Sequence, residues 1–255
     1  MKGDAKKKFV TQTNMQSSMG GNPFQQLDSY NTPFENELTA AEKMKIRRCI
    51  LVGISILIGI TIVFVALGLY VFPGAILHPV TYLIMGILML ISLFFMFYII
   101  YKLITGQVMS KSFLRTHFFI TTLFFMLLLA TQAHNLDSPA FALLCLLVSF
   151  VLILIAAEYG FRAQWKDIQS WIMPLVVATF VILLFSFINI FFLKTKILQI
   201  ITSVLLILLF TAFTVYNANA YTNGDCLYNC CEEGVFEIYY NFAQIAHSLF
   251  SIFSD

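Results

Sequence analysis

The chain has 255 residues, of which 60% are hydrophobic and only 11% are charged. Soluble domains are on average roughly half apolar and a quarter charged, so this composition excludes an ordinary soluble protein and predicts an integral membrane protein. The net charge of +2 is too small to indicate nucleic-acid binding. We therefore expect the lipid bilayer to surround most of the chain, and we expect no nucleic-acid partner.

Residues 1–42 form a predicted polar N-terminal tail that is rich in Gln, Asn, Ser and Gly. Its first residues are basic, but no apolar run follows before residue 49, so the pattern does not indicate a signal peptide. A segment of this composition does not bury enough apolar surface to fold alone, and a partner could hold it. The Thr39–Glu42 spacing of a capping box predicts a helix start, and residues 43–255 are predicted to be the transmembrane domain.

Seven segments of the second region are apolar enough, or placed suitably, to be helical spans. The third begins beside Arg115 and His117, and the seventh is only half apolar. Short connections predict that neighbouring segments pack antiparallel, which gives an all-α, polytopic seven-helix bundle. The predicted spans are 49–72, 80–101, 113–133, 139–158, 171–193, 197–221 and 235–253.

Basic residues between the spans predict the orientation of the chain. With the N-terminus inside, the inner flanks carry nine Lys or Arg residues and the outer loops carry two, Lys194 and Lys196. Because positively charged loops stay on the inner side, this bias places the N-terminus on the cytosolic or matrix side. The nine inner residues are Lys43, Lys45, Arg47, Arg48, Lys102, Lys111, Arg115, Arg162 and Lys166.

Polar side chains concentrate in the last two spans, where hydrocarbon would not tolerate them. Such groups either line an ion or proton path or form interhelical hydrogen bonds of roughly 0.6–2 kcal/mol each. The sequence leaves both interpretations open, although a carboxylate at 237 has to pair, protonate or meet water. The predicted polar core comprises Thr214, Asn217 and Tyr221 on the sixth span, with Glu237, Asn241, Gln244 and Ser248 in one stripe on the seventh.

The five cysteines do not form the pattern of a disulfide framework. Cys49 and Cys145 lie in apolar runs, where thiols behave as small hydrophobic groups. Cys226, Cys230 and Cys231 lie in an acidic loop and form a possible thiol cluster; no fourth ligand is near, so we expect no metal. Glu158 and Arg162 have the spacing of a helical ion pair. No catalytic motif or cofactor-binding pattern is present, and we expect no enzyme activity and no cofactor.

Residues 161–253 resemble the Bax inhibitor-1 (transmembrane Bax inhibitor motif) family. That family's sixth helix ends in a Phe-x-x-Tyr/Phe-x-Val-Tyr-Asp-Thr-Gln type motif, and this chain has the run from Phe210 to Asn219 at that place. The family's last helix reads Leu-Tyr-Leu-Asp-Phe/Ile-Ile-Asn-Leu-Phe, where this chain has Ile238 to Ile245. Lys166-Asp167 and the run Phe187–Phe192 are similar to two further family segments. Seven spans with the N-terminus inside is also the family's arrangement.

The resemblance implies a pH-sensitive calcium leak, controlled by two aspartates on the last two helices that share a proton. Asn217 and Asn241 stand at those positions in this chain. Asparagine is nearly isosteric with protonated aspartate and can still hydrogen-bond, but it does not ionise and offers Ca²⁺ no negative charge. We therefore expect a divergent member that keeps the bundle and lacks the proton switch. Glu237, one turn from Asn241, is the nearby carboxylate that could partly substitute.

Two hypotheses of function follow from the sequence. The first is an ion-leak or regulatory membrane protein of the Bax inhibitor-1 type, acting in calcium handling and cell-death control, with Ca²⁺ as a possible partner. The second is a non-catalytic accessory subunit of a large membrane complex, which residues 1–40 and the Phe-rich helix faces would bind. The family occurs in endomembranes (endoplasmic reticulum or Golgi) and in the mitochondrial inner membrane, so both compartments, including a respiratory assembly in the latter, remain open.

Overall fold

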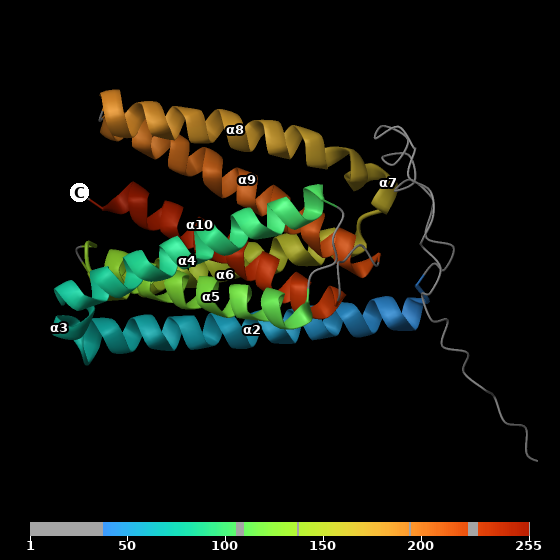
Figure 1. Cartoon of the computed structure of the whole chain (residues 1–255), viewed down its shortest axis with the longest axis horizontal. Coiled ribbons are helices and arrows are strands. Elements are labelled where there is room, and N and C mark those ends of the chain that lie inside the picture. Colours follow the sequence, from blue (N-terminus) through green and yellow to red (C-terminus); the bar gives the residue numbers. More distant parts are fainter. Residues whose placement is uncertain (1–37, 106–109, 137, 194, 224–228, 255) are drawn as a thin grey trace, which may run out of the picture. The chain divides into compact units, whose positions relative to one another are not determined.

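The computed structural model describes residues 38–105, 110–136, 138–193, 195–223 and 229–254. These residues are helical apart from short connections (Figure 1). The predicted all-α architecture is confirmed in the described part of the chain. The elements are α2 Ala40–Tyr70, α3 Pro73–Ile76, α4 Pro79–Ile104, α5 Lys111–Ala133, α6 Pro139–Arg162, α7 Trp165–Ile168, the 3₁₀ turn η2 Gln169–Trp171, α8 Ile172–Ile188, the π-helical turn η3 Asn189–Leu193, α9 Lys196–Thr222 and α10 Cys230–Phe253.

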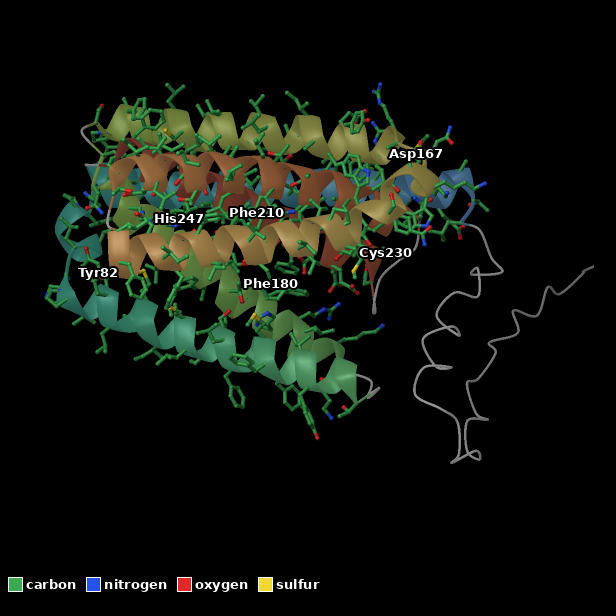
Figure 2. All side chains as sticks on the ribbon, turned by 90° about the horizontal axis from the view of Figure 1, so that it is seen from above. Tyr82, Asp167, Phe180, Phe210, Cys230 and His247 are labelled. Atoms are coloured by element: carbon green, nitrogen blue, oxygen red, sulfur yellow. A yellow bond between two sulfur atoms is a disulfide. The ribbon has the colours of Figure 1, made fainter. Side chains whose placement is uncertain are left out.

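Helix α10 lies at the centre of the helical unit, although it follows the other helices along the chain (Figure 1). It packs against α9, α2, α6 and α5, and its aromatic residues Tyr239, Phe242 and Phe250 are among the most deeply buried side chains. Helices α4 and α8 lie outside this group, with principal contacts to α5 and α9 respectively. Tyr82 on α4 and Phe180 on α8 are correspondingly exposed (Figure 2). The polar stripe of α10 is therefore covered by neighbouring helices.

Six of the long helices have the length and apolarity needed to cross a membrane. They are α2, α4, α5, α6, α9 and the continuous segment Trp165–Ile188 that contains α8. Helix α10 does not meet that criterion, because it carries polar residues along its length. A polytopic helical membrane fold is thus established, whereas the seventh span stays a prediction.

Side-chain caps mark the beginnings of three helices. The predicted capping box of α2 is present: the Thr39 hydroxyl accepts from the Glu42 amide, and the Glu42 carboxylate accepts from the Thr39 amide. Ser110 caps α5 and Asn229 caps α10 in a similar way. Because of its cap, α2 begins at Ala40, well before the apolar run that starts at residue 49.

Short loops do not always place consecutive helices side by side. Helices α4 and α5, α8 and α9, and α9 and α10 are sequential neighbours that pack together. Helix α2, however, has its main contacts with α10, α5 and α6 rather than with α4. The expectation of sequential packing was therefore wrong for α2 with α4, and likewise for α5 with α6 and for α6 with α8. The physical reason is that α10 needs cover on several sides, and α2 supplies part of it.

Glycines allow two helix pairs to approach closely. A Cβ added at Gly160 of α6 would lie 2.4 Å from the Val215 carbonyl oxygen of α9. A Cβ at Gly234 of α10 would lie 2.6 Å from Cδ1 of Ile50 in α2. Small residues at such crossings let helix backbones pack closely where lipid gives little hydrophobic driving force. The contact of α6 with α9 thus depends on the missing side chain at residue 160.

Candidate functional site

Charged side chains collect at the end of the helical unit where α2, α5 and α10 begin, here called the charged end. The Glu158 carboxylate accepts hydrogen bonds from Arg47 of α2 and, at 2.7 Å, from Nε of Arg162 one turn later in α6. The predicted Glu158–Arg162 pair is confirmed and extended by Arg47. Arg115 of α5 pairs with Glu232 of α10, with 2.7 Å between Nε and Oε2. These ion pairs connect α2 to α6 and α5 to α10.

A disulfide joins Cys49 of α2 to Cys231 of α10 at the charged end, with 5.8 Å between the Cα atoms. The expectation that the cysteines form no disulfide framework and that Cys49 behaves as a small apolar group was therefore wrong, and Cys231 of the possible thiol cluster is disulfide-bonded. The two residues are 182 positions apart, and only the packing of α10 on α2 brings them together. Cys230 is disulfide-bonded as well, and Cys145 is a buried free thiol. Cys226 lies outside the described residues.

The predicted polar residues of α9 have different environments. Thr214 is fully buried, and its hydroxyl donates to the Phe210 carbonyl one turn earlier. Asn217 and Tyr221 are half-buried. The Asn217 amide makes no hydrogen bond to any described residue, whereas Tyr221 has an interaction partner. The Thr214 hydroxyl thus has its hydrogen-bond partner within α9 and does not hold α9 to a neighbouring helix.

Asn219 is the α9 side chain that makes interhelical hydrogen bonds, and it was absent from the predicted site. Its Nδ2 donates to the carbonyl oxygens of Gly160 and Ala163, each at 2.7 Å. These carbonyls belong to the last turn of α6, where no further helical amide is available to them. The sequence signal was weak: an amide in α9 and orphan carbonyls in α6 have no fixed spacing along the chain.

The stripe on α10 is turned into the helical unit. Asn241 and Ser248 are almost completely buried, and Glu237 and Gln244 are half-buried. Asn241 Nδ2 and Ser248 Oγ have no hydrogen-bond partner among the described residues. No hydrogen bond within the described part of the chain joins Asn217 to Asn241, although α9 and α10 pack together. The positions of the expected latch lie on adjacent helices, but the amides do not hold each other in this structure.

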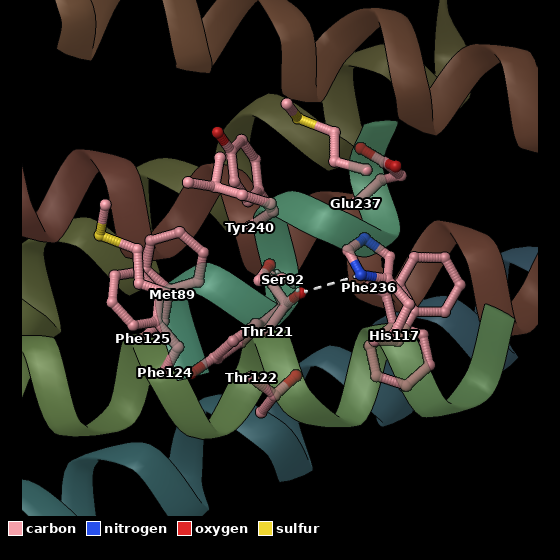
Figure 3. Close-up of a pocket in the computed structure, with 14 residues that line it drawn as sticks. Met89, Ser92, His117, Thr121, Thr122, Phe124, Phe125, Phe236, Glu237 and Tyr240 are labelled. Carbon is pink, nitrogen blue, oxygen red and sulfur yellow. Dashed lines mark hydrogen bonds between the residues drawn. The ribbon is translucent and has the colours of Figure 1, made fainter. Parts of the chain in front are cut away.

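A cavity of about 300 Å³ lies between α4, α5 and α10 (Figure 3). Its walls are mainly aromatic and methionine side chains. Phe118 and Phe236 stack there with 4.4 Å between ring centroids, and Phe125 contacts Tyr240 edge to face. The residues with polar groups that line it are Ser92 from α4, His117, Thr121 and Thr122 from α5, and Glu237, Tyr239 and Tyr240 from α10.

Glu237 brings a carboxylate to this cavity. It makes no ion pair or hydrogen bond with any described residue. Across the cavity, Thr121 Oγ1 lies 3.4 Å from His117 Nδ1 and 2.8 Å from Ser92 Oγ (Figure 3). The described residues contain no group of three His, Cys, Asp or Glu that could hold a metal ion.

Comparison with protein-family models identifies the chain. The model described as "Inhibitor of apoptosis-promoting Bax1" matches residues 50–255, which is most of the sequence. The chain belongs to the Bax inhibitor-1 family. The match extends the resemblance from the last helices back through α2. A search of curated proteins gave no match.

As a Bax inhibitor-1 family member, the chain is an integral membrane protein whose lipid-facing surface lies on the outer helices. The family resemblance places the latch on α9 and α10. At the two positions that the resemblance implies for the latch, this chain has Asn217 and Asn241, and Glu237 lines the cavity beside α4 and α5. Glu237 lies one turn before Asn241 in the same stripe of α10, but it lines the cavity, whereas Asn217 and Asn241 do not.

Proposed function

We propose that this protein is a calcium leak or a regulator of membrane ion balance that works without the di-aspartyl proton switch. The observation that carries the proposal is the pair of amides, Asn217 and Asn241, in a chain that belongs to the family and folds as a helical bundle. Amides stay uncharged across the physiological pH range. A change of pH therefore does not alter the packing of α9 and α10 through these two residues. Glu237 lies at the wall of a separate cavity, where it does not restore a carboxylate pair.

Flux through reconstituted vesicles tests this proposal. Purified protein in lipid vesicles with an internal calcium dye is compared with an Asn217→Asp/Asn241→Asp double variant. We expect the wild-type flux to vary little with pH around neutrality and the double variant to gain a pH-dependent flux, because two nearby carboxylates titrate as a coupled pair. A wild-type flux that rises steeply with pH would refute the proposal.

A second candidate function is an accessory subunit of a membrane complex. It is favoured by the outward faces of α4 and α8, which carry large exposed aromatic residues such as Phe94, Phe97 and Phe180. Each of these two helices packs mainly on one neighbour. The predicted binding role of residues 1–40 falls largely on residues outside the described part. A native gel separates the candidates: migration with a large complex supports the subunit, and a single-chain particle supports the leak.

The compartment and orientation belong to the same proposal. We expect an endomembrane or the mitochondrial inner membrane, with the charged end on the cytosolic or matrix side. The basic residues at that end, such as Lys43, Arg47 and Arg115, favour this orientation.

A further inference from the structure

We propose that the cavity between α4, α5 and α10 binds a lipophilic organic cation, with Glu237 as its counter-ion. This site is separate from the Asn217 and Asn241 positions and does not depend on whether the protein conducts ions. The ligand class is a hydrophobic amine or quaternary ammonium compound with one positive charge and an aromatic or aliphatic body.

The charge of Glu237 indicates that the ligand is a cation. Glu237 has no ion pair among the described residues, whereas Arg115 pairs with Glu232 and Arg47 pairs with Glu158. An ionised carboxylate among transmembrane helices is costly unless it meets a cation or water. A cationic ligand would provide the positive charge that none of the described residues brings to Glu237. The same carboxylate disfavours fatty acids and anionic lipids.

The walls of the cavity carry the second step. Aromatic side chains from α5 and α10 line the space, among them Phe118 and Phe236, which stack on each other. The face of an aromatic ring attracts ammonium groups, which is the basis of aromatic cages for quaternary ammonium ligands. Methionines Met89 and Met96 of α4 add an adaptable apolar wall. Lined this way, the site resembles a small-molecule pocket more than an ion path.

The volume of the cavity and its position beside α4 suit a small molecule that enters from the bilayer. A volume of about 300 Å³ lies at the lower end of ligand-binding pockets, which suits a small amphiphilic molecule. Helix α4 forms one wall and has its principal contacts with α5, and none of its side chains between Pro79 and Ile99 is buried. A cation that partitions into the bilayer can therefore reach the cavity alongside α4.

Two molecules of the same shape test the proposal. Phenyltrimethylammonium carries a positive charge, and tert-butylbenzene is its neutral counterpart. Binding is measured by equilibrium dialysis of the full chain in lipid nanodiscs, with empty nanodiscs subtracted. We expect saturable binding of phenyltrimethylammonium, weakened about tenfold or more by Glu237→Gln, and weaker binding of tert-butylbenzene that Glu237→Gln leaves unchanged.

Matched variants separate this site from general effects of charge and folding. Glu233→Gln removes the same charge one turn earlier on α10 but outside the cavity wall, and it should bind within about twofold of wild type. Ser92→Phe fills the cavity without changing the charge and should reduce the binding of both molecules. Thermal unfolding of each variant checks its folding. The proposal is overturned if wild type shows no saturable binding, if Glu237→Gln binds like wild type, or if Glu233→Gln loses as much affinity as Glu237→Gln.

Discussion

Two asparagines on α9 show how different the same side chain can be two positions apart. Asn219 is buried and donates to two carbonyls at the end of α6, whereas Asn217 is half-buried and makes no hydrogen bond to a described residue. The resemblance to the family drew attention to Asn217, because the latch position is there. The contacts give Asn219 the larger part in holding α9 to its neighbours.

We expect Asn219→Leu to destabilise the protein by about 1–3 kcal/mol, because it leaves buried carbonyls of Gly160 and Ala163 without a donor. Asn217→Leu is the matched control and should change stability much less. Thermal unfolding in mild detergent measures both. Equal losses in the two variants would contradict the assignment of the interhelical bonds to Asn219.

Glu237, whose carboxylate has no ion pair among the described residues, gives a prediction in the opposite direction, namely a gain of stability on substitution. Glu237→Gln keeps the shape of the side chain and removes a charge that lacks a partner, so it should raise the unfolding temperature when no ligand is present. Glu158→Gln is the comparison, and it should lower stability by about 1 kcal/mol or less, since its charge pairs with Arg47 and Arg162 near the surface. A lower unfolding temperature for Glu237→Gln would mean that an interaction stabilises this carboxylate.

Local spacing made some residue contacts predictable, and others were not. The Thr39–Glu42 capping box and the Glu158–Arg162 pair follow from three- and four-residue spacings within one helix, and both are present. The contacts of Asn219 and the bond between Cys49 and Cys231 join different helices, so they depend on packing that no local pattern encodes. The cavity beside Glu237 likewise arises from three separate helices.

At the level of elements, apolar length predicted the helices well. Each of the seven predicted spans corresponds to a long helix, with ends that differ by a few residues except at the start of α2. What apolar length does not give is the neighbour of each helix. The half-apolar composition of α10, which made its assignment uncertain, is explained by its central position: other helices rather than lipid cover its polar stripe.

The crossing of α6 and α9 gives a prediction about a single methyl group. Gly160→Ala places a Cβ against the Val215 carbonyl and should force the helices apart, which also weakens the bonds of Asn219. We expect a loss of about 1–3 kcal/mol from overpacking. Gly86→Ala on α4 is the control, since nothing lies within 4 Å of an added Cβ there. Thermal unfolding should separate the two variants, and similar behaviour would contradict the close crossing.

For the whole molecule, the disulfide links the first long helix to the central one. Mass spectrometry of alkylated, unreduced protein should find a peptide that joins Cys49 to Cys231. Cys49→Ser/Cys231→Ser should lower stability by about 2–4 kcal/mol, and reduction, which also breaks the disulfide of Cys230, should lower it at least as much. Cys145→Ser removes a buried free thiol and should retain the cross-link. Absence of the linked peptide would contradict the assignment.

The disulfide and the basic residues at the charged end favour different sides of the membrane. Basic flanks favour the cytosolic or matrix side, whereas disulfides persist mainly in oxidising compartments. In the proposed orientation we therefore expect Cys49 and Cys231 to be mostly reduced in growing cells and to pair after mild oxidation. Alkylation in intact cells, followed by mass spectrometry, measures the fraction. A bond that is fully formed in untreated cells would reverse the proposed orientation.

The central position of α10 has a consequence for biosynthesis. A ribosome makes α2, α5, α6 and α9 before it makes the helix that all four contact. Until α10 enters, Cys49 has no partner, and the inner faces of the earlier helices, including Thr61 beside the future position of Tyr239, are uncovered. Partly assembled chains of this kind are prone to misassembly and to quality control. A premature stop before Cys230 would therefore leave the outer helices intact in sequence but without the helix around which they are arranged.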